Sequence, residues 1–156
     1  MRYTSTSGVA RREEYPALPL AELLGWADVV SVHAPLNERT RGLIGERELR
    51  MMKPSALLIN VARGGIVDEA ALARALDEEV IAGAAIDVFT REPIAADNPL
   101  LAVKDPDRLL LSPHNAWSPA EAIDALIGLV AENITNFMEK NKSSLYLRQT
   151  PTEEPM

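Results

Sequence analysis

Side chains suited to proton transfer and anion binding lie at or just beyond the ends of apolar runs in the sequence. His114 offers an imidazole that titrates near neutral pH, and Glu92 offers a carboxylate. Arg63 offers a planar guanidinium fork that can grip a carboxylate, and two glycines follow it. The segments concerned are His33-Ala34-Pro35, Ala62-Arg63-Gly64-Gly65, Asp87 to Glu92, and Pro113-His114-Asn115.

The apolar runs before these segments predict the strands that position them. The runs are short and largely unbroken, which is typical of strands buried on both faces of a parallel sheet. Because the carboxyl ends of parallel strands meet at one edge of a sheet, where ligands bind, we expect the four segments to lie together there. The predicted strands are Val29–Val32, Ala56–Val61, Ala82–Val88 and Arg108–Ser112.

Helical stretches separate the strands, and the repeated strand–helix units predict an α/β fold with a parallel sheet and right-handed crossovers. The expected helices are Leu20–Leu24, Glu46–Met52 and Glu69–Glu79, the last with Asp68 as its N-cap. A fourth helix is expected after Ser118-Pro119-Ala120-Glu121, which is a strong helix start. Its apolar stripe predicts packing against a core and consists of Ile123, Leu126, Ile127, Val130, Ile134, Phe137 and Met138.

The composition is that of an ordinary globular protein, with 47% hydrophobic and 25% charged residues. The net charge of −7 argues against a nucleic-acid partner, which needs clustered basic side chains. The apolar runs are too short to span a bilayer and no signal peptide is evident, so we expect a cytoplasmic protein without a membrane partner. The chain has no cysteine, and we expect no metal site.

Each of these side chains, taken alone, also has an ordinary structural interpretation. Arg63 before two glycines is typical of a solvated turn, and Glu92 before a proline is typical of an exposed loop. His114 can cap a strand end, and Asp87 can bond to nearby backbone. His33 is expected to pack rather than to react. The joint placement at one sheet edge is what favours a functional site.

Four stretches of the sequence resemble the signatures of the D-isomer-specific 2-hydroxyacid dehydrogenases. They occur in the order found in that family, and the resemblance extends over roughly residues 18–140. Within the family the sequence is most similar to glycerate dehydrogenases and hydroxypyruvate reductases. The stretches are ADVVSVHAPL at 27–36, NVARGGIVDE at 60–69, DVFTREP at 87–93 and SPH at 112–114.

The resemblance implies an oxidoreductase that transfers a hydride between NAD or NADP and a small 2-hydroxy or 2-oxo acid. His114 would be the acid–base group, Glu92 would hold its ring, and Arg63 would grip the substrate carboxylate. Gly64 and Gly65 would let the backbone approach the ligand closely. Asp87 would meet the nicotinamide carboxamide. The implied cofactor-binding residues are Ala34, Pro35, Val61, Ala62, Arg63, Asp87, His114, Ala116 and Trp117.

The family's phosphate-binding loop, Gly-x-Gly-x-x-Gly, is not found in this sequence, since no two of its eight glycines have the Gly-x-Gly spacing. Residues 1–4 correspond to the family's second strand. Residues 1–142 are therefore expected to form an incomplete Rossmann-type domain without the first strand and its glycine-rich loop, followed by a disordered polar tail at 143–156. Because of the basic pair Arg11-Arg12, NADP stays a candidate cofactor alongside NAD.

The sequence favours a portion of a 2-hydroxyacid dehydrogenase that keeps the reacting side chains and is inactive as an isolated chain. One alternative is a non-enzymatic, corepressor-like module that binds NAD and a protein partner. Another is a degenerate, truncated product. The resemblance also implies a homodimer. The sequence does not separate one small 2-hydroxy acid from another.

Overall fold

A computed structural model describes residues 1–9 and 14–138 and divides the chain into two compact units, Met1–Ala116 and Trp117–Met156. The first unit contains the sheet and every predicted site residue except Trp117. Three predictions fall outside the described residues: the domain boundary at 142–143, the tail at 143–156, and the Arg11-Arg12 pair.

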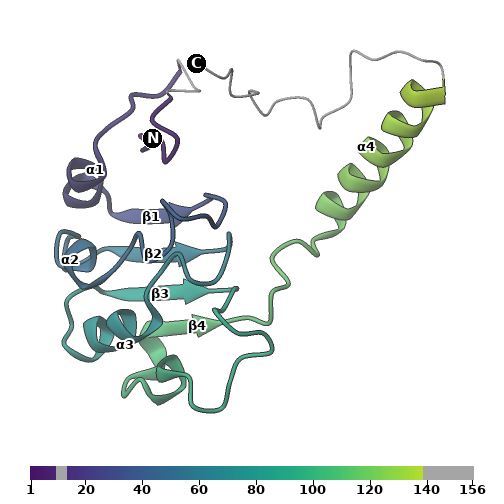
Figure 1. Cartoon of the computed structure of the whole chain (residues 1–156). Helices are drawn as coiled ribbons and strands as arrows, with labels where there is room; N and C mark the ends of the chain where they lie inside the picture. Colours follow the sequence, from purple (N-terminus) through teal and green to yellow (C-terminus); the bar gives the residue numbers. More distant parts are fainter. Residues whose placement is uncertain (10–13, 139–156) are drawn as a thin grey trace. The chain divides into compact units, whose positions relative to one another are not determined.

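The first unit is built on one sheet of four parallel strands, which confirms the predicted α/β fold. In the register of the sheet, Asn60 of the second strand pairs with Ile86 of the third, and Ile86 pairs with Leu111 of the fourth. All four strands therefore end at one edge, and the residues that follow them emerge there. The strands are shorter than the apolar runs and follow the order β1 (Val29–Val32), β2 (Leu57–Asn60), β3 (Gly83–Ile86) and β4 (Leu109–Leu111) (Figure 1).

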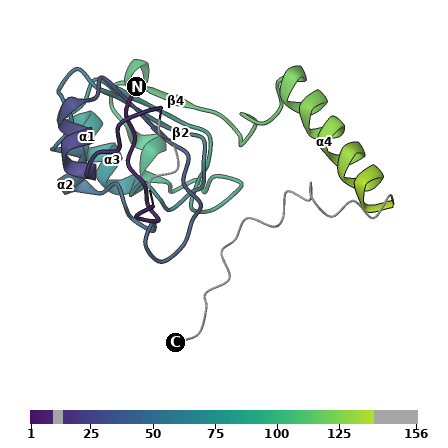
Figure 2. The same ribbon diagram turned by 90° about the horizontal axis from the view of Figure 1, so that it is seen from above.

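Three α-helices of the first unit lie next to one another against the sheet (Figures 1 and 2). They are α1 (Leu20–Trp26), α2 (Glu46–Leu49) and α3 (Glu69–Asp77), and two short 3₁₀ helices, η1 (Pro99–Ala102) and η2 (Pro106–Arg108), precede β4. Asp68 caps α3 as predicted, since its carboxylate accepts from the Ala71 N–H at 2.9 Å. Residues 1–4 form only an isolated bridge, between Tyr3 and Ala17, where a strand was expected.

The sheet of the first unit has one buried face and one exposed face. Leu58 is fully buried in a core that includes Leu72 of α3, whereas the adjacent Leu57 is 44% exposed. Leu110 on the same face as Leu57 is 68% exposed. The prediction of burial on both faces is therefore wrong for β1, β2 and β4, because all three helices pack on the side to which Leu58 points.

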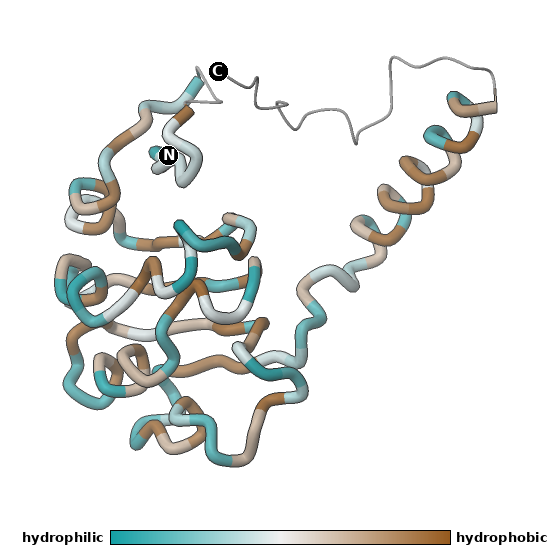
Figure 3. The backbone as a smooth tube through the Cα atoms, viewed as in Figure 1, coloured by the Kyte–Doolittle hydropathy of each residue, from teal (hydrophilic) through white to brown (hydrophobic). Residues whose placement is uncertain are grey.

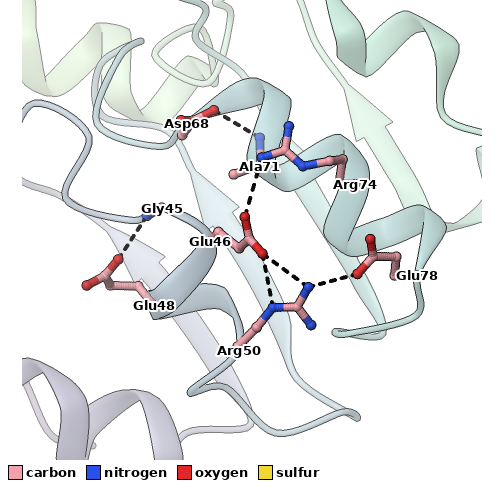
Figure 4. A network of polar contacts seen from close by, with 8 residues as sticks. All are labelled: Gly45, Glu46, Glu48, Arg50, Asp68, Ala71, Arg74 and Glu78. Atoms are coloured by element: carbon pink, nitrogen blue, oxygen red, sulfur yellow. Dashed lines mark hydrogen bonds and ion pairs between the residues drawn. The ribbon is translucent and has the colours of Figure 1, made fainter.

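A network of ion pairs joins α2 to α3 at the surface (Figure 4). The Arg50 guanidinium donates to Glu46 at 3.2 Å and to Glu78 at 2.9 Å, and Arg74 lies 3.7 Å from Glu46. Each of these side chains is more than half exposed, so the network contributes little to the free energy of unfolding.

In the second unit the structure describes one long helix, α4 (Ala120–Met138), which begins two residues after Ser118. Its apolar residues, seen as brown bands in Figure 3, include Leu126, Val130 and Phe137, and none of the helix's residues is buried. The expected core packing of this stripe stays a prediction. In the part of the chain that the structure describes, no helix has both the length and the apolar character needed to cross a bilayer.

The two faces of β2 predict different costs for neighbouring substitutions. Leu58→Ala should lower the free energy of unfolding by about 2–5 kcal/mol, because it opens a cavity in the core. Leu57→Ala, the control on the exposed face, should change it by roughly 0.5 kcal/mol. Urea unfolding followed by circular dichroism measures both values. Equal losses in the two variants would contradict the assignment of the buried face.

Candidate active site

Four loops meet at the edge of the sheet where the parallel strands end. β1 is followed by His33, β2 by Val61, β3 by Asp87 and β4 by Ser112. The predicted clustering of the four segments is therefore a consequence of the strand order and register. The His33 side chain contacts its own strand, with Nε2 2.8 Å from the Ser31 hydroxyl.

His114 and Glu92 form the pair in this edge that can move a proton. His114 Nδ1 lies 2.7 Å from Glu92 Oε2, and the other carboxylate oxygen accepts from the Phe89 N–H at 2.9 Å. The Phe89 N–H and the His114 imidazole together hold the pKa of Glu92 below its ordinary value. Since an ionised carboxylate only accepts, it directs the proton of the neutral imidazole to Nδ1.

Asp87 anchors the turn that presents His114. It is 3% exposed and accepts hydrogen bonds from the Ser112 hydroxyl at 2.5 Å and from the N–H groups of Asn115 and Ala116, each at 2.9 Å. Burial alone would raise the pKa of Asp87, but the Ser112 and backbone hydrogen bonds outweigh it and lower that pKa.

These contacts bracket a residue in an unusual backbone conformation. His114 has a φ of 52°, a left-handed value that is costly for a side chain other than glycine. Asp87 holds the chain both before it, at Ser112, and after it, at Asn115 and Ala116. The buried carboxylate thus stabilises the conformation that brings the imidazole to Glu92.

Asn60 plays the corresponding part for the Arg63 turn. Its side chain is 1% exposed, accepts from the Ala62 N–H at 3.1 Å and donates to the Arg63 carbonyl at 3.2 Å. The Arg63 guanidinium donates to the Ala62 carbonyl at 2.6 Å and is exposed. Among the described residues, no hydrogen bond or ion pair joins Arg63 to Glu92 or His114.

The two glycines after Arg63 are required by the protein's own packing, and their expected close approach to a ligand stays a prediction. A Cβ atom on Gly64 would lie 1.9 Å from the Phe89 carbonyl oxygen, so no other residue fits there. Gly65 has a φ of 80°, which favours glycine. The Arg63 turn therefore packs directly on the loop that carries Glu92.

The remaining predicted cofactor-binding residues are placed as follows. Ala34 and Pro35 follow β1, and the Pro35 carbonyl accepts from the buried Thr40 hydroxyl at 2.6 Å. Val61 and Ala62 follow β2, and Ala116 ends the first unit. Trp117 begins the second unit.

Sequence reasoning did not identify Asn60 or Ser112 as parts of the site. A signal for Asn60 was present, because it is the one polar residue in the apolar run Ala56–Val61. Ser112 ends the last apolar run in the same way. A polar residue at the end of a buried strand is therefore a useful marker of a loop anchor.

The chain is similar to known proteins over most of its length. Residues 1–116 match the family described as D-isomer specific 2-hydroxyacid dehydrogenase, NAD binding domain. A putative 2-hydroxyacid dehydrogenase from Haemophilus influenzae is 44% identical over 130 residues, which are 83% of this chain and 41% of that protein. A glycerate dehydrogenase from Methylorubrum extorquens is 42% identical over 119 residues, 76% of this chain and 38% of that protein.

A solved structure shows the same fold. It is an NADPH-dependent glyoxylate/hydroxypyruvate reductase from Sinorhizobium meliloti in complex with NADP and malonate, with a TM-score of 0.71 and 32% identity. The match covers 88% of this chain and 42% of that one. The chain thus spans about two fifths of the length of the curated relatives it matches.

The anchoring role of Asp87 predicts a pH-dependent loss of stability. Asp87→Asn places an amide donor where the Ala116 N–H needs an acceptor, so the free energy of unfolding at pH 7 should fall by roughly 1–3 kcal/mol. Because the pKa of Asp87 is lowered in the fold, its contribution is complete above the unfolded carboxyl pKa and is lost as pH falls through the folded value. The difference between the two proteins should therefore shrink at pH 3.

Urea unfolding at pH 7, 5 and 3 measures this difference. Ser112→Ala is the matched control, since it removes the hydroxyl donor and leaves both backbone donors satisfied. Ser112→Ala should lower the free energy of unfolding at pH 7 by less than Asp87→Asn does. An Asp87→Asn penalty that stays constant down to pH 3 would show that the carboxylate charge does not hold the turn.

Proposed function

The chain belongs to the D-isomer specific 2-hydroxyacid dehydrogenase family, and on that premise we propose that it supplies the nicotinamide-binding and proton-transfer half of such an enzyme. Its reaction would be the interconversion of a small 2-oxo acid and its 2-hydroxy acid. The observation that carries the proposal is the 2.7 Å contact between His114 and Glu92 at the carboxyl edge of a parallel sheet.

His114 would act as the acid in reduction of the oxo acid. Its Nδ1 is held by Glu92, so Nε2 would donate a proton to the carbonyl oxygen and take it back in the reverse direction. Glu92 keeps its charge because the Phe89 N–H also binds it. In each reduction the imidazole therefore gives one proton to the product and takes a new one from solvent.

Arg63 would hold the carboxylate of the acid. Within the described residues, its guanidinium is engaged through Nη1 alone, with the Ala62 carbonyl, so the rest of the planar fork is available to a ligand. The same cation favours polarisation of the neighbouring carbonyl group. This arrangement supports a substrate in which an oxo group and a carboxylate are adjacent.

The residues at this edge fit a nicotinamide cofactor. Asp87 Oδ2 accepts from the Ala116 N–H, and a carboxylate oxygen can accept a further hydrogen bond from a carboxamide. Ala34, Pro35, Val61 and Ala62 would border the cofactor from the ends of β1 and β2. When bound, NAD or NADP supplies or accepts the hydride. The solved relative from Sinorhizobium meliloti holds NADP, which supports this choice of cofactor.

The 156-residue chain should bind dinucleotides weakly and show no turnover by itself. The motif Gly-x-Gly-x-x-Gly, whose backbone N–H groups and helix end bind pyrophosphate, is not in its sequence. Titration of the ¹⁵N-labelled chain with reduced nicotinamide mononucleotide should shift the amide signals of Ala62, Asp87 and Ala116. ADP-ribose, which lacks nicotinamide, is the matched control and should not shift the amide signal of Ala116.

Two outcomes would contradict this part of the proposal. Nicotinamide mononucleotide that shifts no signal at the carboxyl edge would remove the cofactor from this site. Binding of NADH or NADPH by the monomeric chain tighter than about 10 μM would show that the phosphate-binding loop is not needed.

The roles of the three side chains predict distinct kinetic changes in a chimera. Residues 1–116 would replace the aligned part of the Methylorubrum extorquens glycerate dehydrogenase. His114→Ala should lower kcat/KM by about 10²–10⁴-fold. Glu92→Gln should lower kcat/KM by less than His114→Ala does, because it weakens the hold on the imidazole without removing the acid. Arg63→Lys should raise KM and lower kcat together.

Glu78→Gln, on the surface just after α3, is the control and should leave both constants near those of the unsubstituted chimera. Near-normal turnover after His114→Ala would mean that another group delivers the proton. An unchanged kcat/KM after Glu92→Gln would show that Glu92 does not hold the imidazole in place.

A further inference from the structure

The carboxylate of Glu69, which the proposed reaction does not use, makes two hydrogen bonds to the segment that follows β3. Glu69 is the first residue of α3 and is half-buried. Its Oε1 accepts from the Thr90 N–H at 2.6 Å, and its Oε2 accepts from the Asn98 side-chain amide at 2.8 Å. The two partners lie 21 and 29 residues away in the sequence. Glu69 thus ties the start of α3 to both ends of the loop that carries Glu92.

The orientation of the Asn98 side chain is fixed from its other end. Asn98 is buried, and its Oδ1 accepts from the Leu100 N–H at 3.0 Å, which caps η1. Its Nδ2 must therefore point to Glu69. If the Asn98 amide turned over, its NH₂ group would face the Leu100 N–H, and two donors would oppose each other.

The Thr90 N–H that Glu69 binds is next to the N–H that holds the proton-transfer pair. Phe89 donates to Glu92 at 2.9 Å, and Thr90, the next residue, donates to Glu69 at 2.6 Å. Two carboxylates therefore bind two successive N–H groups of one loop. The Phe89 carbonyl packs against Gly64, so the peptide between Phe89 and Thr90 is held from several sides.

We propose that Glu69 is a positioning residue for the proton-transfer pair, because its two oxygens fix the Phe89–Thr90 peptide and so set Glu92 against His114. The position requires an acceptor on both oxygens, which only a carboxylate provides. A glutamine that keeps the Thr90 hydrogen bond would turn its NH₂ group toward the Asn98 NH₂ group. The consequence for catalysis rests on the proposed function, whereas the consequence for Glu92 does not.

The positioning role and a simple charge effect predict opposite changes at Glu92. The Phe89 N–H lowers the pKa of Glu92 by its hydrogen bond. Two titratable groups also act on that pKa: His114 lowers it and Asp87 raises it. If Glu69 acted only as a nearby negative charge, Glu69→Gln would lower the pKa of Glu92 further. If Glu69 positions the loop, Glu69→Gln weakens the contacts of Glu92 with Phe89 and His114 and raises that pKa toward its ordinary value.

The test is a double-mutant cycle in the full 156-residue chain, read out by the NMR titration of the Glu92 side-chain carboxyl carbon and by exchange of the Thr90 amide. Glu69→Gln should move the Glu92 midpoint upward and speed exchange of the Thr90 amide by about tenfold or more. Asn98→Asp in the Glu69→Gln background restores complementary partners, since the new carboxylate accepts both from the introduced glutamine amide and from the Leu100 N–H. It also restores the net charge, so both readouts should return toward those of the unsubstituted chain.

Glu78→Gln is the matched control, a surface carboxylate just beyond the other end of α3, and should move neither readout. A Glu92 midpoint that falls or stays in place after Glu69→Gln would overturn the proposal, and so would a double variant no better than the single one. If Glu69→Gln does not fold, the double variant should fold, and its failure beside a folded Glu78→Gln protein would also overturn the proposal. None of these readouts needs a nucleotide, so a failure of the proposed function is recognised separately by the nicotinamide titration.

Discussion

Two buried polar side chains, Asn60 and Asp87, stand side by side where β2 and β3 end. The Asp87 N–H donates to the Asn60 carbonyl at 3.0 Å, and the two side chains are 1% and 3% exposed. A buried amide or carboxylate without partners costs several kcal/mol, so each must draw its partners from the adjoining loops. Asn60 takes them from the Arg63 turn and Asp87 from the His114 turn. The geometry of the site follows from satisfying these two groups.

The two halves of the site differ in how firmly their reactive groups are held. His114 is bound at its ring by Glu92, and Asp87 binds the backbone N–H groups of the two residues that follow it. Arg63 has a fixed backbone, but its exposed guanidinium is held only by the Ala62 carbonyl among the residues that the structure describes. Under the proposed function, this difference would suit a small acid, since a proton must travel along a fixed line while a carboxylate can be bound from several angles.

The sheet and the location of the site could be predicted from the sequence because they depend on local patterns. Short apolar runs indicated the four strands, and the rule for parallel sheets placed Arg63, Glu92 and His114 at one edge. The contacts of Glu69 could not be predicted, because an acidic residue in the first turn of a helix is ordinary and its partners come from a distant loop. The apolar stripe of α4 predicted the helix correctly, but periodicity identifies a face and not what covers it.

The contact between Gly64 and the Phe89 carbonyl has an implication for how this sequence can vary. Gly64 is only partly buried, and glycine has no side chain with which to bind or react. Any replacement must nevertheless push the Glu92 loop away, since the added carbon would overlap a carbonyl oxygen. A mutational screen would therefore score Gly64 as though it were a reacting group. Intolerance at this position records the close fit of two loops, and a chemical role should not be inferred from it.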